Sequence, residues 1–426
     1  MKDKEELLKE IEEKLKNYFV SKNSFIPGKT KIPLSDKKFD LEEVMESIES
    51  LISGNVTMGE KVRKFEKLFA DYIGVAYSVM VNSGSSANLL ALSVLTNHAL
   101  KDRIKPGDEI ITPAVTWATT IFPICNVNAI PVLVDIDPET LTIDFNNIEK
   151  AINENTKAIM PVHLVGNPCN MKEIMEIAEK RNLYVIEDAC EAHGAEFDGK
   201  KVGSFGDFST FSFYFSHHIT TIEGGMLLTD NEELYELAKA LRVFGWTRDL
   251  NNKKELAKKY PQFDERWTFV NSGYNFRPTE IQGAFGIHQI KKLDAFLKSR
   301  RGNAEYLLNR LKKYSEYLSF QKENPGGKNA WLGFSITIKK NAPFTKNEFS
   351  AYLESKGIET RPIMTGNFAK QPVATNGFIN YKTVGKLENS DFITNNSFLF
   401  GIHSEIDKKE IEYIAHCIEE FLEKKL

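Results

Sequence analysis

Short apolar runs alternate with amphipathic segments through the middle of this chain, and this alternation constrains the fold more than any other feature. Segments with helical periodicity, such as Asn88–Leu100 and Asn170–Arg181, lie between several of the runs. Because a crossover helix joins parallel strands, the pattern predicts an α/β fold with a mostly parallel sheet and helices on both faces. The predicted strands are Ser78–Val81, Glu109–Thr112, Ile130–Val134, Ala158–Val162, Leu183–Ile186, Phe208–Phe213 and Met226–Thr229.

The chain divides into three predicted parts. Residues 1–40 form an N-terminal helix followed by an extended arm, in which Pro27, Gly28 and Pro33 interrupt regular structure. Residues 41–294 form the large α/β domain, and residues 295–426 form a smaller α+β domain. The smaller domain contains a predicted strand, Trp331–Ile338, and a closing helix, Glu410–Leu422.

Composition excludes several classes of protein. With 426 residues, of which 42% are hydrophobic, the chain can bury a large core and is neither mainly disordered nor a small disulfide-stapled scaffold. The net charge of -4 does not favour nucleic acid or an anionic membrane as partner. No apolar run approaches the roughly 20 residues that span a bilayer, and the charged N-terminus is unlike a signal peptide. We therefore expect a cytoplasmic enzyme whose four cysteines are free thiols: Cys125, Cys169, Cys190 and Cys417.

Three local motifs could carry chemistry. The small residues Gly84, Ser85 and Ser86 follow a predicted strand and open a helix, which suits either a phosphate site or an ordinary helix cap. Asp188 ends an apolar strand, where a carboxylate could hold a pyridinium nitrogen protonated or could cap a helix.

The third motif contains two adjacent histidines, His217 and His218, between Phe211 and Met226. Neighbouring side chains diverge and no third ligand is close in the sequence, so this pair is a poor metal site. A lone histidine is more often structural, and no metal site is predicted.

Taken in order, these motifs resemble the nucleotide-sugar aminotransferases of the pyridoxal-phosphate fold type I group. The resemblance runs from about Leu41 to the C-terminus and includes Gly107–Ile111, Val134–Asp137, Pro161–Asn167 and Gly273–Arg277. It implies a large domain with a mostly parallel seven-stranded sheet, a pyridoxal phosphate cofactor and a homodimer with shared active sites. The implied cofactor-binding residues are Gly84, Ser85, Ser86 and Ser212 at the phosphate, Trp117 and Asp188 at the ring, Glu191, and Asn275 reaching into the neighbouring subunit.

One departure from that family is informative. His217 stands where an aminotransferase has its Schiff-base lysine, and the nearest lysines in the sequence are Lys201 and Lys239. This replacement resembles the nucleotide-4-keto-6-deoxysugar 3-dehydratases of dideoxysugar biosynthesis. The resemblance implies that pyridoxal or pyridoxamine phosphate binds non-covalently, that His217 is the catalytic acid and base, and that L-glutamate is the amino donor. The product would be a 4-keto-3,6-dideoxy sugar for lipopolysaccharide or capsule.

The nucleotide and the sugar remain open. The stretch Arg242–Phe276 contains no cysteine, which argues against the branch with an iron–sulfur cluster and for a GDP-linked substrate. Phe244 stands where a polar ring is expected, so the sugar could be a variant such as a deoxyheptose. The resemblance implies sugar contacts from Arg248, Arg361 and Asn367. Alternatives are a CDP-4-keto-6-deoxyglucose 3-dehydrase-like enzyme, a sugar aminotransferase, and a non-catalytic binding protein of the same fold.

Overall fold

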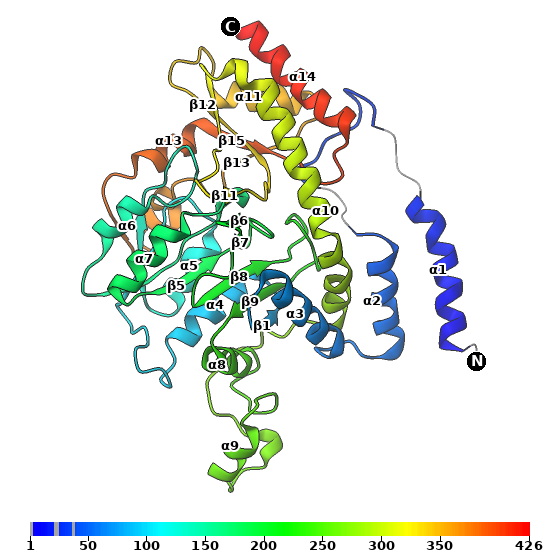
Figure 1. Ribbon diagram of the computed structural model, residues 1–426, viewed down its shortest axis with the longest axis vertical. Coiled ribbons are helices and arrows are strands. Elements are labelled where there is room, and N and C mark those ends of the chain that lie inside the picture. Colours follow the sequence, from blue (N-terminus) through cyan, green and yellow to red (C-terminus); the bar gives the residue numbers. More distant parts are fainter. Residues whose placement is uncertain (1–2, 21–24, 36–38) are drawn as a thin grey trace.

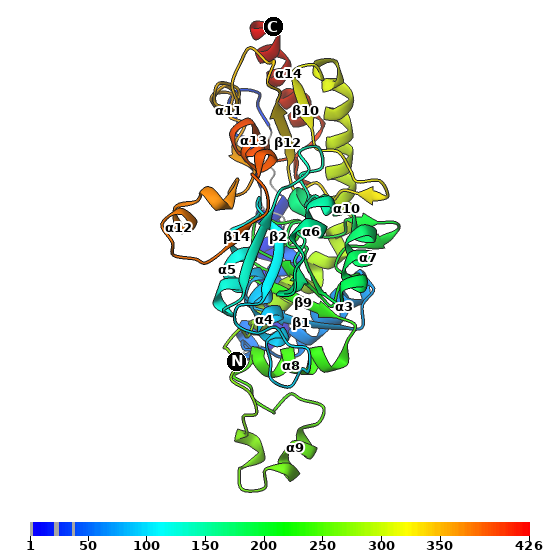
Figure 2. The same ribbon diagram turned by 90° about the vertical axis from the view of Figure 1, so that its left-hand side faces the viewer.

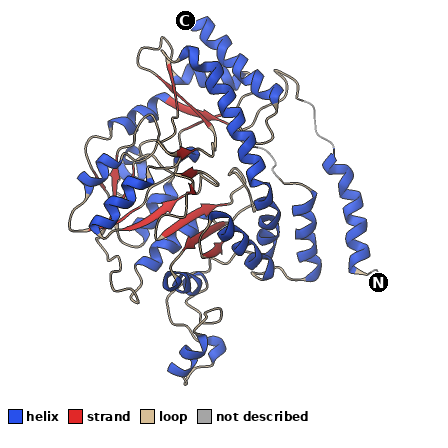
Figure 3. Cartoon of the chain, viewed as in Figure 1, coloured by secondary structure: helices blue, strands red, loops and turns tan. Residues whose placement is uncertain are grey.

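The computed structural model describes residues 3–20, 25–35 and 39–426. Within these residues, eight strands form one sheet in the order β1-β9-β8-β5-β4-β2-β3-β14. Figures 1 and 3 show strands at the centre of the chain with helices around them. All seven predicted strands occur in it, and the eighth, β14, is added at one edge. The strands are β1 (Tyr77–Val81), β2 (Glu109–Pro113), β3 (Ile130–Val134), β4 (Thr156–Ile159), β5 (Tyr184–Asp188), β8 (Phe208–Ser212), β9 (Gly225–Thr229) and β14 (Lys382–Thr383).

The directions of the strands determine where the loop after β8 lies. The run from β8 to β14 is parallel, whereas β9 is antiparallel to both of its neighbours, β8 and β1. An antiparallel neighbour needs no crossover helix, so residues 213–224 connect β8 to β9 directly. This connection, the β8–β9 loop, therefore lies at the edge where the parallel strand β5 also ends.

Helices cover both faces of the sheet, as the alternation predicts. On one face α4 (Gly84–Leu95), α5 (Ala118–Asn126) and α8 (Glu232–Arg242) contribute to a buried cluster around Leu90, Ile186 and Leu227. On the other face α3 (Glu60–Ile73) and α10 (Glu280–Leu311) pack on Phe211 and Met226. Further along this second face lie α6 (Phe145–Ala151) and α7 (Met171–Arg181).

The C-terminal part is built on an antiparallel four-stranded sheet in the order β10-β12-β15-β13. The predicted strand and closing helix correspond to β12 (Phe334–Ile338) and α14 (Lys408–Lys425). The predicted division at 294/295 falls inside α10, which runs unbroken from the large sheet to the small one (Figure 1). Further elements of this part are β10 (Leu318–Phe320), α11 (Lys346–Ser355), β13 (Thr360–Pro362), α12 (Pro372–Thr375), α13 (Glu388–Asn396) and β15 (Ser397–Phe400). A small third sheet, in the order β11-β6-β7, pairs β11 (Gly327–Lys328) with β6 (Glu196–Phe197) and β7 (Lys200–Lys201) of the large domain.

Two segments leave the main body. The first helix, α1 (Lys4–Val20), lies beside α2 (Leu41–Ser53), and the segment around α9 (Lys253–Lys259) projects away from the sheet (Figures 1 and 2). Residues 25–35 of the predicted arm run along the small sheet, and residues 21–24 and 36–38 lie outside the described part. In that described part, no helix combines the length and apolar character that a membrane crossing requires.

Candidate active site

A cavity of about 560 Å³ opens at the carboxyl edge of the parallel strands. Open α/β folds bind ligands at this edge, because loops from several strands converge there. The cavity wall combines the start of α4, the end of β5 and the β8–β9 loop with residues of the small sheet. The predicted site residues that line it are Gly84, Ser85, Trp117, Asp188, Glu191, Ser212, His217 and Arg361.

The first turn of α4 forms one end of the cavity and is the candidate site for an anion. The helix is capped by Ser83, whose hydroxyl accepts a hydrogen bond from the Ser86 N–H at 3.1 Å. Gly84 is packed so closely that an added Cβ would lie 2.5 Å from the Ser212 Cβ. The absence of a Cβ therefore lets the first turn of α4 pack directly against Ser212, so that the exposed Ser85 and Ser212 line the cavity together. A helix N-terminus in this position suits an anion.

Asp188 is the buried acid of the cavity, with 5% of its surface exposed. One carboxylate oxygen accepts hydrogen bonds from Asn88 Nδ2 at 3.0 Å and Thr120 Oγ1 at 2.8 Å. The other accepts from the Cys190 N–H at 3.2 Å. Asn88 is itself oriented by Thr210, whose hydroxyl donates to Asn88 Oδ1 at 2.6 Å. This network holds the carboxylate in one orientation.

Asn88 and Thr120 support Asp188 in the candidate site, although no sequence motif had assigned either residue a role. Asn88 lies one helix turn after Gly84, four residues later, so it lies on the same face of α4. The spacing of Gly84 and Asn88 could therefore have placed Asn88 near the site from the sequence alone. No sequence pattern could have done so for Thr120, because its contact with Asp188 joins residues 68 apart in sequence.

Glu191 is a second buried acid in the wall, with 8% of its surface exposed. The pKa of its carboxyl is raised to about 8, mainly by burial and also by the charge of the nearby Asp188, while the hydrogen bond from the Val165 N–H opposes the shift. That N–H donates to Glu191 Oε2 at 2.8 Å. The carboxyl group is therefore protonated at neutral pH and can donate a hydrogen bond into the cavity.

His217 lines the cavity from the β8–β9 loop, where it is half-buried. Its backbone N–H donates to the Tyr214 carbonyl at 3.0 Å. His218 is fully buried instead, with Nε2 3.0 Å from the carbonyl oxygen of Ala330. The two imidazoles thus point in different directions, as expected for adjacent residues, and only His217 reaches the cavity.

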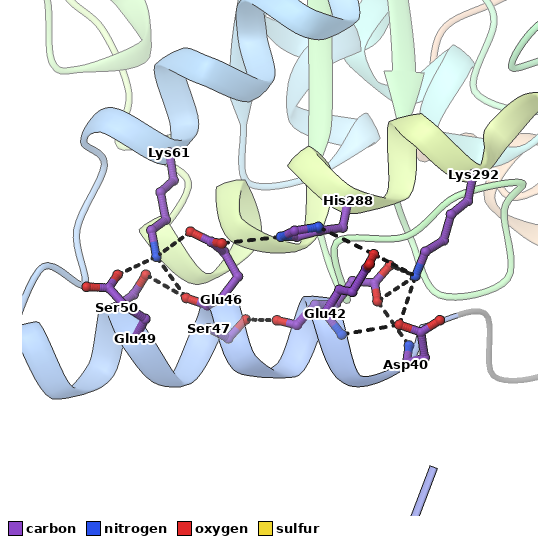
Figure 4. A network of polar contacts seen from close by, with 10 residues as sticks. Asp40, Glu42, Glu46, Ser47, Glu49, Ser50, Lys61, His288 and Lys292 are labelled. Atoms are coloured by element: carbon purple, nitrogen blue, oxygen red, sulfur yellow. Dashed lines mark hydrogen bonds and ion pairs between the residues drawn. The ribbon is translucent and has the colours of Figure 1, made fainter. Parts of the chain in front are cut away.

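The β8–β9 loop is anchored from behind by α10. The buried Gln289 accepts a hydrogen bond from the Thr220 N–H at 3.0 Å and donates to Glu43 Oε1 at 2.7 Å. Glu43, on α2, is fully buried and is paired with Lys292 at 2.7 Å. Lys292 also contacts Asp40 at 2.9 Å, within the network of charged residues between α2 and α10 shown in Figure 4. The loop that carries His217 is therefore connected to the packing of two helices.

Four predicted residues are absent from the cavity wall: Ser86 lies in the first turn of α4 without lining the cavity, and the other three lie elsewhere. Arg248 is in the projecting segment, where it packs over Trp246 and lines a separate cavity of about 360 Å³. Asn275 is exposed, and its Oδ1 accepts from Arg277 Nε at 2.9 Å. Asn367 is buried, donates to Asp391 at 2.8 Å and accepts from the Ala369 N–H at 3.1 Å. None of the three side chains is part of the wall of the larger cavity.

Comparison with known proteins places this geometry among enzymes. Residues 37–419 match the model of the DegT/DnrJ/EryC1/StrS aminotransferase family. The chain is 42% identical over 381 residues to GDP-4-keto-6-deoxy-D-mannose 3-dehydratase of Yersinia pseudotuberculosis, covering 89% of this chain and 95% of that protein.

Solved structures agree with these sequence matches. The Escherichia coli GDP-4-keto-6-deoxy-D-mannose 3-dehydratase with bound hydrated PLP has a TM-score of 0.86 and 41% identity, covering 91% of this chain and 99% of that one. A GDP-4-keto-6-deoxymannose 3-dehydratase with a trapped PLP-glutamate geminal diamine has the same TM-score and identity, covering 91% and 100%.

Proposed function

The chain belongs to the DegT/DnrJ/EryC1/StrS aminotransferase family, and on this premise we propose that it removes the 3-hydroxyl group of a nucleotide-linked 4-keto-6-deoxy sugar. The fold is that of the fold type I pyridoxal-phosphate enzymes, as the sequence predicts. The proposed cofactor is pyridoxal or pyridoxamine phosphate, the proposed nucleotide is GDP and the proposed amino donor is L-glutamate. The product, a 4-keto-3,6-dideoxy sugar, suits lipopolysaccharide or capsule synthesis in the cytoplasm.

The position of His217 in the cavity wall is the observation that carries this proposal. Among the described residues that line the cavity there is no lysine. A lysine amine would bind the cofactor covalently and return nitrogen to the substrate, whereas an imidazole cannot form that bond. An imidazole does move protons efficiently near neutral pH. The arrangement therefore favours proton transfer over amino transfer.

The remaining wall residues suit a phosphorylated pyridine ring. The cradle at Gly84, with Ser85 and Ser212, would hold the phosphate at the N-terminus of α4. Asp188 would pair with the ring nitrogen, and the exposed Trp117 offers a flat face on which the ring can stack. The protonated Glu191 and the backbone around it would contact the polar edge of the ring.

The bound cofactor supplies an electron sink conjugated with C4 of the sugar, which allows the C3 hydroxyl to leave. Asp188 would keep the ring nitrogen of the bound cofactor protonated, and Asn88 and Thr120 hold the Asp188 carboxylate in place. His217 would act as the acid and base: its imidazole would accept a proton on the cofactor side of the site and would donate one to the departing C3 hydroxyl. Arg361, at the mouth of the cavity, is the proposed contact for an anionic group of the substrate or amino donor.

We also propose a homodimer with shared active sites. Asn275 and Arg248 lie outside the cavity of their own chain, on exposed parts of the large domain. In an isologous dimer the same residues of a second copy could complete each site. Sedimentation of the active protein tests this assembly, and an active monomer would contradict it.

Product stoichiometry tests the reaction. We expect incubation with GDP-4-keto-6-deoxymannose and L-glutamate to yield a sugar that has lost one oxygen atom, with 2-oxoglutarate and ammonia formed in equal amounts. An aminotransferase would instead form a 4-amino sugar and 2-oxoglutarate without ammonia, which would refute the proposal. A parallel incubation with CDP-4-keto-6-deoxyglucose distinguishes the two nucleotides.

A further inference from the structure

The N-terminal arm, residues 25–35, contributes to the active-site cavity although it precedes the part of the chain that matches the family, residues 37–419. Its contribution is Leu34, a half-buried side chain in the cavity wall. The arm therefore adds a feature to the site that the family match does not include.

Backbone pairing holds the arm in place. The Ile32 N–H donates to the Gly357 carbonyl at 2.8 Å, and the Glu359 N–H donates to the Ile32 carbonyl at 3.0 Å. Ile32 itself is buried, with 2% of its surface exposed. The Leu34 N–H then donates to Glu359 Oε2 at 2.9 Å. Leu34 is thus held at the cavity by the hydrogen bond of its own N–H to Glu359 and by the paired backbone of Ile32, two positions earlier.

Close packing against Gly401 also restricts the position of the arm. A Cβ added at Gly401 would overlap the carbonyl oxygens of Pro33 and Leu34. The carboxylate of Glu359 also binds the guanidinium of Arg361, which lines the same cavity. One carboxylate therefore positions both an apolar and a cationic wall residue.

Leu34 belongs to an apolar wall, which we define as Leu34, Leu332, Met364 and Leu399. The walls that the large domain contributes are mostly polar, with serine, threonine, aspartate, glutamate and histidine side chains. A ligand binds most favourably when its apolar groups contact the apolar wall and its polar groups contact the polar side chains of the large domain. A 6-deoxy sugar has one apolar substituent, the methyl group at C6.

We propose that the apolar wall is the subsite for the C6 methyl group, and that Leu34 makes the enzyme select 6-deoxy over 6-hydroxy sugars. This inference rests on the proposed function, because it concerns the sugar of the same nucleotide-linked substrate. A C6 hydroxyl group placed against these side chains would lose its hydrogen bonds to water without replacement. Discrimination by one such group in an apolar pocket reaches about 10-fold to 100-fold.

Two stable substrate analogues allow the contribution of the C6 hydroxyl group to binding to be measured. GDP-6-deoxy-D-mannose and GDP-D-mannose differ only in the C6 hydroxyl, and their dissociation constants can be measured by calorimetry on the cofactor-loaded enzyme. We expect the wild type to bind the 6-deoxy ligand about 10-fold more tightly. Leu34→Ser should reduce this ratio to about 3-fold or less, because the serine hydroxyl can accept the extra polar group.

Matched variants separate selectivity from general damage. Leu34→Met keeps the wall apolar and should preserve the ratio. Ile26→Ser makes the same kind of change at an exposed position of the arm and should also preserve it. Equal affinities in the wild type, or an unchanged ratio in Leu34→Ser, would overturn the inference and leave the proposed function standing. If neither ligand binds the wild type, the proposed function fails as well.

Discussion

Replacing Glu191 with glutamine should remove a pH-dependent loss of stability. Burial raises the pKa of this carboxyl from 4.5 to about 8, reinforced by Asp188 and opposed by the Val165 N–H. Between these two values the native protein keeps a proton that the unfolded chain releases. The native state therefore binds more protons, and the free energy of unfolding falls as the pH rises through this interval.

The size of the effect follows from the shift. Each pH unit in the interval costs about 1.4 kcal/mol, so the full interval corresponds to about 5 kcal/mol. Glutamine cannot ionise, and its amide has the shape and a donor like that of the protonated acid. The unfolding entropy of a chain this long converts each kcal/mol into roughly 1 °C of melting temperature. From about pH 5.5 to pH 8 the variant should therefore gain about 3 °C relative to the wild type.

Thermal denaturation of cofactor-free wild type and Glu191→Gln, followed by circular dichroism across this pH range, measures the difference. Glu179→Gln, at an exposed position of α7, is the control for removing one glutamate. A gap in melting temperature between Glu191→Gln and the wild type that stays constant with pH would refute the reasoning.

Substitutions at three further positions, His217, Gly84 and Lys292, test the site and its support. His217→Asn should leave cofactor binding largely intact and reduce the rate of dehydration, measured as product formation, by about 10²–10⁴-fold or more. His218→Asn should reduce this rate less. A larger loss of rate in His218→Asn than in His217→Asn would mean that the wrong histidine was assigned. His217→Lys should also lose dehydration and form a borohydride-reducible bond to the cofactor, and failure to form it would contradict the placement. Gly84→Ala adds a Cβ only 2.5 Å from the Cβ of Ser212. The affinity for the cofactor, measured by absorbance titration, should therefore fall by about 10-fold or more. An unchanged affinity would argue against a phosphate site at Gly84. Lys292→Met should lower the free energy of unfolding, measured by urea denaturation, by about 3 kcal/mol, because it leaves the buried carboxylate of Glu43 without its cation. Lys291→Met, at an exposed position, is the control, and equal effects of the two substitutions would contradict this reasoning.

Local chemistry made much of the site predictable. Ser85 and Gly84 open a helix directly after a strand, and Asp188 ends another strand, so each could be located from a few neighbouring residues. The carboxyl ends of parallel strands share one edge, which brings such motifs together whatever the loops between them. His217 was assigned by its place in a motif, and the structure places it in the cavity wall while His218 is turned inward.

Long-range contacts could not be predicted in the same way. The support of Asp188 by Thr120, the pairing of β14 with β3 and the entry of Leu34 into the cavity each join residues far apart in the chain. No periodicity or motif marks such a contact, because the two partners are selected by packing and by backbone hydrogen bonding. Arg248 shows the converse, since its motif suggested a sugar contact but its segment projects away from the cavity of its own chain.

The sequence by itself determined the fold class, the family, the seven main strands and the residue types available for chemistry, because side-chain periodicity and short motifs are properties of neighbouring residues. Only the tertiary structure decided which side chains share the cavity, which carboxyl is buried enough to keep its proton, and where the N-terminal arm lies. Burial and proximity depend on how distant segments pack, and a pKa, a hydrogen-bond partner and a cavity wall all follow from that packing.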